Sequence, residues 1–160
     1  MSASAREAIV APPDNPFPYG RRYVERTVPN GSITFEQAPL TLEDVLHPQE
    51  GDQVTHSNLH QHICVYLYTV LRRRLAGVTG AVVLYDVRIA WDDLALKAHR
   101  PDLAAIFGVR EHKNWSAFDV AAEGVRPTVL IEITSPETRG IDLTVKFDEY
   151  DLAGVEFYYQ

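Results

Sequence analysis

Apolar residues recur at helical spacing between Thr55 and Ala76, and this pattern predicts the first long helix of the chain. The repeat consists of Leu59, Ile63, Tyr66, Leu67, Val70, Leu71 and Leu75. Gly77 suits the C-terminal stop, because glycine readily adopts the left-handed conformation that ends many helices. Three arginines, residues 72–74, lie in the last turn, where cations interact favourably with the helix dipole. We therefore expect this helix to end near Ala76.

Short apolar runs after this helix predict strands at residues 81–85, 87–91, 103–109, 128–133 and 155–159. The run at 128–133 is the clearest. Because side chains alternate along a strand, its two faces separate into Val129, Ile131 and Ile133 on one side and Leu130, Glu132 and Thr134 on the other.

A second helix is predicted from Asp142, a good N-cap, to Ala153, with Gly154 as its stop. Its apolar stripe would consist of Leu143, Phe147 and Tyr150. Residues 110–126, which lie between two predicted strands, are interpreted as one long connection, and such connections are often functional or mobile.

The N-terminal part of the chain is rich in residues that interrupt helices. Six prolines fall within residues 1–40, with Gly20 and Gly31 between them. We interpret residues 1–40 as a partly ordered arm in which residues 34–37 are extended. One helical turn is expected at Thr41–Leu46, and residues 41–160 are expected to form the domain.

Composition narrows the class of protein without identifying it. The chain has 160 residues, of which 46% are hydrophobic, so it can form one domain with a substantial core. Its 22 acidic and 15 basic residues give a net charge of −7, which argues against non-specific coating of nucleic acid. The single cysteine, Cys64, excludes a disulfide framework, and no apolar stretch approaches the roughly 18 residues of a membrane span. We expect a soluble, cytoplasmic protein.

Two carboxylates stand at the ends of predicted strands. Glu132 interrupts an apolar run, where an ionised side chain is costly unless it is paired or bound to metal. Asp102 begins another run, so adjacent antiparallel strands would bring both acids to the same end of the sheet. Two nearby carboxylates repel each other and favour a cation between them, and oxygen ligands suit Mg²⁺ or Mn²⁺. The alternatives are a partly solvated or arginine-paired Glu132 and an ordinary turn at Pro101-Asp102.

Lys146 is the third candidate. It lies one turn into the predicted second helix, and helical side chains lean towards the helix N-terminus. Its amine would therefore reach back towards Glu132, whereas the alternative is an exposed lysine paired with Asp142. Tyr150 lies one turn further along the same helix, so Asp142 and Tyr150 are candidate supporting residues.

Three stretches of sequence carry a family resemblance. They are Pro101-Asp102 followed by an apolar run, Val129–Arg139 with its Glu132 and Ser135-Pro136 turn, and Asp142–Tyr158 with Lys146, Tyr150 and Gly154-Val155. Over roughly residues 41–160 the chain resembles the Uma-two family of restriction endonucleases, within the PD-(D/E)XK nuclease superfamily. The resemblance implies an α/β restriction endonuclease-like core, a central mixed β-sheet flanked by helices.

The resemblance also implies the roles of the site residues. Asp102, Glu132 and the backbone carbonyl of Ile133 would bind the metal. The superfamily's usual lysine would fall at position 134, which is Thr134 here, and Lys146 on the following helix matches the family's place for it. Relatives usually continue beyond the equivalent of Gln160, so a C-terminally truncated domain is one possibility.

The function implied is a Mg²⁺- or Mn²⁺-dependent endonuclease that hydrolyses phosphodiester bonds of DNA, with a homodimer suited to cutting both strands. One alternative is a catalytically inactive module that keeps the nuclease fold for binding. A weaker alternative is an unrelated hydrolase that uses Glu132 as a general base.

Other polar groups have simpler explanations. His56 and His60 have zinc-ligand spacing, but they lack a third ligand and are interpreted as exposed, with His56 as the possible supporting residue at the cleft. Asp92 and Asp93 are interpreted as residues of a solvated turn, and Arg72–Arg74 as cations that interact with the helix dipole. Trp115 is interpreted as a loop anchor, and Cys64 as a core residue.

Overall fold

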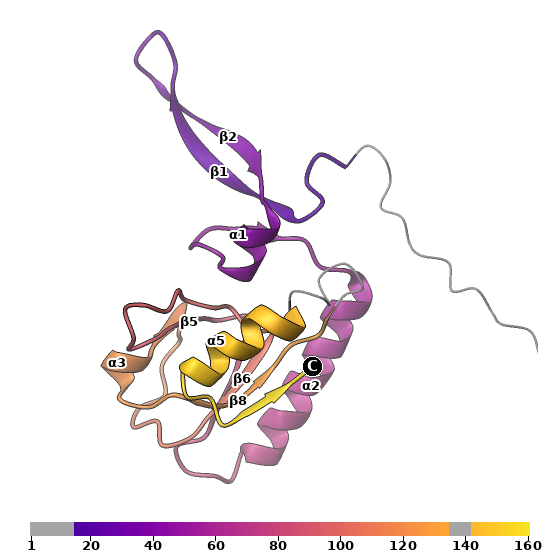
Figure 1. Ribbon diagram of the computed structural model, residues 1–160, viewed down its shortest axis with the longest axis vertical. Helices are drawn as coiled ribbons and strands as arrows, with labels where there is room; N and C mark the ends of the chain where they lie inside the picture. The colour runs from indigo at the N-terminus through magenta and orange to yellow at the C-terminus, as the bar shows by residue number, and fades with distance from the viewer. Residues whose placement is uncertain (1–14, 135–141) are drawn as a thin grey trace, which may run out of the picture. The chain divides into compact units, whose positions relative to one another are not determined.

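The computed structural model describes residues 15–134 and 142–160, and at residues 142 and 143 the backbone alone. The chain divides into two compact units (Figure 1). Of the described residues, the first unit comprises 15–45 together with Gln49–Thr55. The second comprises Leu46–Pro48, 56–134 and 142–160.

The first unit is a small antiparallel sheet. Strands β1 (Gly20–Thr27) and β2 (Ile33–Pro39) form a hairpin, β3 (Gln53–Val54) pairs with β1, and α1 (Leu42–Leu46) follows β2. The described part of the predicted arm is therefore a regular hairpin, and β1 was missed. The prolines punctuate this hairpin: Pro29 lies in its turn, and Pro39 ends β2.

A partly buried ion cluster links β1 to the segments around Asp44 and Asp52. The Arg22 guanidinium contacts Asp44 at 2.6 Å and Asp52 at 2.8 Å. The side chain of Asp52 is only 1% exposed, so this paired carboxylate is shielded from solvent. The pKa of Arg22 is raised, chiefly by its hydrogen bond to Asp52.

The second unit is built on a four-stranded mixed sheet in the order β4-β6-β8-β9. Its strands are β4 (Val82–Tyr85), β6 (Leu103–Ile106), β8 (Pro127–Ile131) and β9 (Phe157–Tyr159). β6 is antiparallel to both of its neighbours, β4 and β8, whereas β9 runs parallel to β8. All four correspond to predicted strands.

Helices cover both faces of this sheet. Alternate strand residues such as Leu84, Ala104 and Leu130 pack with Tyr150 and Ala153 at the C-terminal helix, in one hydrophobic core. The long helix α2 (Asn58–Leu75) contacts β4 and β6 from the other face (Figure 1). The predicted α/β class, a mixed sheet flanked by helices, is confirmed.

The helix boundaries and one packing assignment differ from expectation. α2 begins at Asn58 because Ser57 is its N-cap and accepts a hydrogen bond from the His60 amide. The second predicted helix starts with a π-helical turn, η1 (Asp142–Lys146), and continues as α5 (Phe147–Leu152). Phe147 was assigned to the apolar stripe but is 55% exposed, because the π turn shifts the helical phase.

The interpretation of residues 110–126 as one long connection was wrong. The segment contains β7 (Ala117–Asp119), which pairs in parallel with β5 (Arg88–Ala90), and the short helix α3 (Val120–Glu123). Phe118 anchors it in the core, and Asp119 caps α3 by accepting the Ala122 amide hydrogen bond. Elements of three or four residues are too short to show a period.

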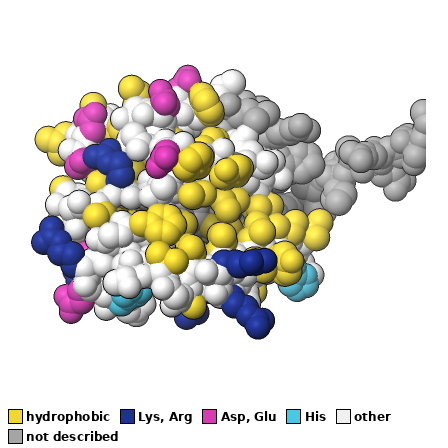
Figure 2. Space-filling view, turned by 90° about the horizontal axis from the view of Figure 1, so that it is seen from below, with side chains coloured by type: hydrophobic (Ala, Val, Ile, Leu, Met, Phe, Trp, Pro, Cys, Tyr) yellow, Lys and Arg dark blue, Asp and Glu magenta, His cyan; other side chains and the backbone are white. Residues whose placement is uncertain are grey.

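The surface of the second unit mixes apolar and basic groups. Hydrophobic side chains gather near the middle of the face seen from below, with Lys and Arg side chains beside them (Figure 2). No helix in the described part of the chain is both long and apolar enough to cross a membrane.

Candidate functional site

The register of β6 and β8 places the two predicted acids opposite each other. Leu103 pairs with Ile131 in antiparallel strands, so Asp102 and Glu132 follow as the next facing positions. The Ile133 amide donates a 2.7 Å hydrogen bond to Oδ2 of Asp102. The strand adjacency required for the two acids to meet is therefore present.

Glu132 is buried, with 5% of its surface exposed. Its Oε1 accepts a hydrogen bond from the Tyr150 hydroxyl at 2.7 Å and lies 3.1 Å from Nζ of Lys146. Burial raises the pKa of Glu132, while the positive charge of Lys146 opposes that shift. The partly solvated or arginine-paired glutamate considered as an alternative is not what the structure contains.

Lys146 is also buried, which excludes the alternative of an exposed surface lysine. It ends the π turn η1, and single π-helical turns are frequent at functional sites. Its amine and the Tyr150 hydroxyl reach the same oxygen of Glu132 from one helical segment. The side chain of Asp142, the other predicted supporting residue, lies outside the described residues.

A histidine that the sequence analysis set aside contacts the site. Nε2 of His60, in the first turn of α2, lies 3.1 Å from Oδ2 of Asp102. This hydrogen bond raises the pKa of His60. His56, the predicted supporting histidine, precedes the helix and stacks on the His60 ring at 4.4 Å. Burial is the main cause of its lowered pKa.

The signal for His60 was available in the sequence. Ser57 is a good N-cap, and a helix that starts at Asn58 places His60 in its first turn and Cys64 one turn later. Cys64 is fully buried, as predicted, with Sγ 3.8 Å from Nδ1 of His60. Burial raises the pKa of Cys64 to about 12. The Cys64 thiol is therefore protonated at neutral pH in the metal-free protein.

The two acids fit a hard divalent cation. The recorded hydrogen bonds and ion pairs to Asp102 converge on Oδ2, and those to Glu132 converge on Oε1. Among the described residues, none engages Oδ1 of Asp102 or Oε2 of Glu132. Within the described residues, each acid is thus held through one of its two oxygens. Carboxylate oxygens are the donors that Mg²⁺ and Mn²⁺ prefer.

Comparison with known protein families identifies the family of the chain. The sequence profile of the Uma2 family, described as "Putative restriction endonuclease", matches residues 51–159, about two thirds of the chain. The chain belongs to the Uma2 family. The family resemblance predicted from the motifs around Asp102, Glu132 and Lys146 is therefore confirmed.

A solved relative shows a more distant likeness. The Uma2 chain is similar to a crystal structure of "a putative nuclease belonging to DUF820" from Anabaena variabilis ATCC 29413. The sequence identity is 18% and the TM-score 0.44, over 61% of this chain and 55% of that one. The chain thus spans about half the length of that nuclease. A search of curated proteins found no match.

The Uma2 chain has a second cluster of possible metal ligands, which is better explained as a hydrogen-bond relay. It contains His47, His99 and Glu149. The Trp91 indole, which can only donate, gives a 2.8 Å hydrogen bond to Nδ1 of His99. Neutral His99 must then carry its proton on Nε2, which lies 2.6 Å from Oε2 of Glu149. A protonated Nε2 has no lone pair for a metal.

This relay predicts a pH-dependent stability. Burial lowers the pKa of His99 to about 4, against 6.5 for an ordinary histidine. Between pH 4 and pH 6.5 the unfolded chain binds a proton at His99 that the folded chain does not. The contribution of His99 to folding stability is therefore fully present above pH 6.5 and is lost as the pH falls towards 4. In urea unfolding, the wild-type free energy of unfolding should fall by a few kcal/mol between pH 7 and pH 4.5 because of His99. In His99→Gln this part of the fall should be absent.

The matched control for this prediction is His112→Gln, which changes an exposed histidine. It should leave the wild-type pH dependence in place. An equal loss of stability on acidification in His99→Gln and wild type would show that His99 is not the group responsible.

Proposed function

We propose that this Uma2 chain is a divalent-metal-dependent endonuclease that hydrolyses phosphodiester bonds of DNA. The observation that carries the proposal is the convergence of Asp102 and Glu132, from adjacent strands, with the buried amine of Lys146. Burying Glu132 and Lys146 beside the partly buried Asp102 is costly and adds little stability, which supports a chemical purpose for the arrangement.

The two carboxylates would hold the ion, which is Mg²⁺ or Mn²⁺, with the Ile133 carbonyl as a further ligand. When bound, such an ion supplies a Lewis acid that lowers the pKa of water and offsets charge on the phosphate. Hydrolysis then adds water across one P–O ester bond. The Ile133 amide and His60 hold Asp102 by Oδ2, so they act as positioning groups.

Lys146 and Tyr150 would act on the other acid. Both contact Oε1 of Glu132, which fixes the carboxylate in one orientation. The Lys146 ammonium would also offer a positive charge to a phosphate held at Glu132, and preorganised charges of this kind stabilise a transition state. Lys146 and Tyr150 would therefore orient Glu132 as a metal ligand, and Lys146 would also offset the charge of the phosphate.

The proposal predicts an absolute requirement for a divalent ion. Purified protein incubated with supercoiled plasmid should produce nicked or linear DNA with Mg²⁺ or Mn²⁺, and no product with EDTA. Restoring excess Mn²⁺ to the EDTA sample should restore cutting, because the folded site remains available to bind it.

Two outcomes would contradict the proposal. Cutting that persists in EDTA would indicate a contaminant or another mechanism. DNA binding without cutting in either metal would favour the inactive binding module that the sequence also allowed.

A further inference from the structure

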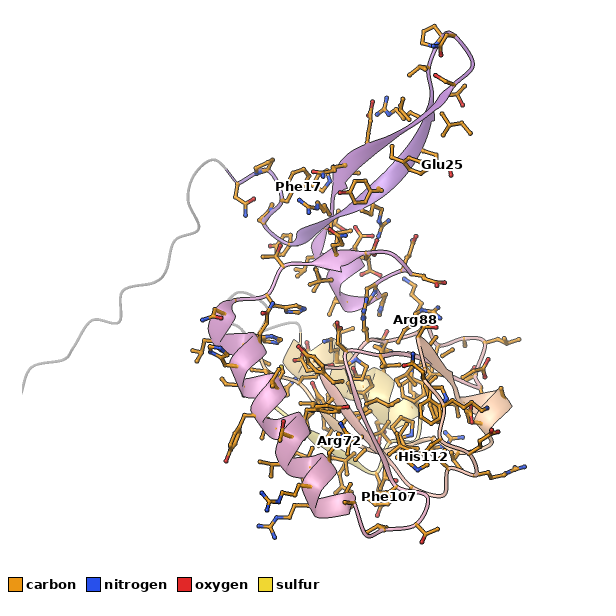
Figure 3. All side chains as sticks on the ribbon, turned by 180° about the vertical axis from the view of Figure 1, so that it is seen from behind. Phe17, Glu25, Arg72, Arg88, Phe107 and His112 are labelled. Atoms are coloured by element: carbon orange, nitrogen blue, oxygen red, sulfur yellow. The ribbon has the colours of Figure 1, made fainter. Side chains whose placement is uncertain are left out.

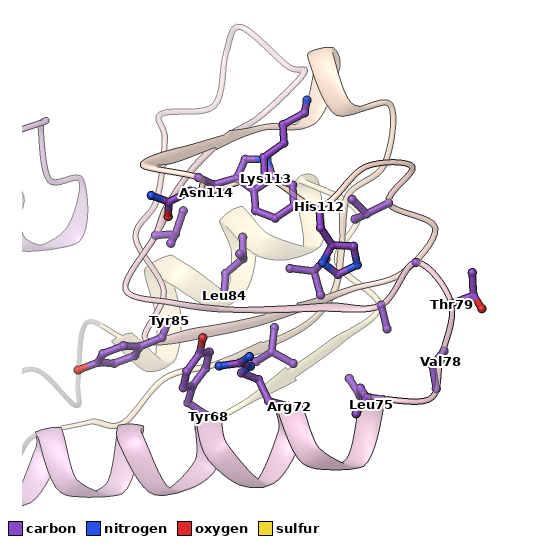
Figure 4. A pocket seen from close by; sticks show the side chains of 18 of the residues that line it. Tyr68, Arg72, Leu75, Val78, Thr79, Leu84, Tyr85, His112, Lys113 and Asn114 are labelled. Carbon is purple, nitrogen blue, oxygen red and sulfur yellow. The ribbon is translucent and has the colours of Figure 1, made fainter.

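We propose that the groove along the free edge of β4 binds a single strand of nucleic acid through its phosphates. The ligand class rests on the proposed function, but the groove is separate from the acids that would hold the metal. A pocket of about 890 Å³ follows β4 from Gly80 to Tyr85. It lies between α2 on one side and residues 109–115 on the other (Figure 4).

The first observation is that β4 is an edge strand. Within the described sheet it pairs with β6 alone, so its outer backbone N–H and C=O groups face the pocket. Its side chains Val82, Val83 and Leu84 are buried and form the floor. A ligand laid along this edge would meet backbone donors as well as the side chains of both walls.

The second observation is the charge of the walls. Arg72, Arg110, His112 and Lys113 line the pocket, and none of the described lining residues is acidic. This is unexpected by chance in a chain with 22 acidic and 15 basic residues. Arg72 from α2 and His112 from the loop after β6 can be followed in Figure 3. Local positive charge on an acidic chain favours a polyanion.

Arg72 and Arg110 are the positive charges of the groove that no described carboxylate neutralises. Lys113 is already paired with Glu123 at 3.0 Å, so its charge is partly compensated. Arg72 lies over the Tyr68 ring, 5.4 Å from its centre, and forms no ion pair with a described carboxylate. Arg110 is exposed and likewise has no described acidic partner. Both guanidinium groups are therefore available to phosphate oxygens.

The third observation is the presence of aromatic side chains along the groove. Tyr68, Tyr85 and Trp115 line it. Aromatic rings beside a basic channel are the usual means by which proteins bind single strands without reading their sequence, because every base has a stacking face. An extended peptide could also pair with the β4 edge, but it would not need the two unpaired arginines.

The groove also leads towards the proposed metal site. Tyr85, at one end of β4, pairs with Leu103, and the Asp86 amide donates a 3.1 Å hydrogen bond to the Asp102 carbonyl. Arg110 lies beyond the other end, where the Val109 amide bonds to the Gly80 carbonyl. A strand in the groove would therefore run between the basic residues and the segment that carries Asp102.

The test compares two double variants that each remove two positive charges. Arg72→Ala/Arg110→Ala changes the groove, whereas Arg73→Ala/Arg74→Ala changes exposed arginines of the same helix that do not line it. Fluorescence anisotropy in EDTA would measure Kd for a labelled single-stranded oligonucleotide of about 20 bases. The groove variant should weaken binding roughly tenfold or more and lower the salt slope of log Kd by about 1.4, while the control stays within about twofold.

Equal weakening by both variants would overturn the groove, because bulk charge would then explain binding. Binding of the oligonucleotide that does not weaken with salt would show that the protein does not recognise its phosphates, and this would also overturn the groove. The proposed function can fail independently of the groove. If the wild-type protein cuts plasmid but both double variants bind the oligonucleotide equally well, only the groove proposal is wrong. If the wild-type protein binds through the groove but never cuts plasmid with Mn²⁺, only the nuclease proposal is wrong.

Discussion

Asp102→Asn should lower plasmid cleavage in Mn²⁺ by about a thousandfold or more while the protein stays folded. The substitution removes one of the two negative charges that would hold the ion, and the loss of a charge-stabilising group in a catalytic site typically costs this much. Asparagine keeps an oxygen that can accept the Ile133 amide hydrogen bond. Initial rates of plasmid nicking, with circular dichroism to confirm folding, provide the measurement.

Asp151→Asn is the matched control for this variant. Asp151 is exposed on α5 and has the same charge as Asp102. Its substitution should leave the cleavage rate within about twofold, as is usual for surface positions. A folded Asp102→Asn protein that cuts at the wild-type rate would remove Asp102 from the proposed site.

Lys146→Met should both abolish cleavage and destabilise the protein in a pH-dependent way. Without the ammonium, buried Glu132 keeps its desolvation cost and loses the charge that offsets it, so its pKa rises further. Breaking a buried ion pair typically costs about 3–5 kcal/mol. In urea unfolding at pH 8 with EDTA, the variant should be less stable than wild type by that amount.

The pH dependence follows from the sign of the shift. An unfolded glutamate releases its proton near its ordinary pKa of 4.5, whereas Glu132 in the folded variant retains it. The folded state then binds more protons, so its stability falls as the pH rises above 4.5. The cost of Lys146→Met should therefore shrink to about 1 kcal/mol at pH 5.

A double variant separates charge from packing. Glu132→Gln/Lys146→Met replaces both charged groups with neutral side chains of similar size, so stability at pH 8 should return to within about 1 kcal/mol of wild type. Cleavage should remain absent. A destabilisation by Lys146→Met that is equal at pH 5 and pH 8 would show that an uncompensated Glu132 is not its cause.

The convergence of the two acids could be predicted from the sequence because strand pairing transmits position simply. Asp102 begins one apolar run and Glu132 ends another, so antiparallel neighbours must bring them to one end of the sheet. The reach of Lys146 followed from the direction in which helical side chains lean. The π turn that carries Lys146 depends on tertiary packing, and no local sequence pattern predicts it.

His60 was missed because its role depends on where a helix starts. Moving the start from Thr55 to Asn58 exchanges the places of His56 and His60, and helix ends are the least certain part of a sequence interpretation. The hairpin of β1 and β2 was missed for another reason. Prolines exclude helices, but they are compatible with hairpin turns and strand ends.

The parallel pair β5 and β7 could not be predicted from local sequence. Each strand has three residues, and Phe118 is buried only because residues from distant segments pack around it in the core. The relay from Trp91 through His99 to Glu149 likewise joins residues up to 58 positions apart, counted from 91 to 149. Contacts of this kind leave no periodic signal in the chain.

A crystal of the protein soaked in Mn²⁺ would test the central claim most directly, through anomalous difference density at the manganese edge. The account predicts one strong peak between the side chains of Asp102 and Glu132, within about 2.0–2.4 Å of a carboxylate oxygen from each. The same peak should be absent from Asp102→Asn crystals. Density only beside His47 and Glu149, or none at the two acids in well-ordered crystals, would contradict it.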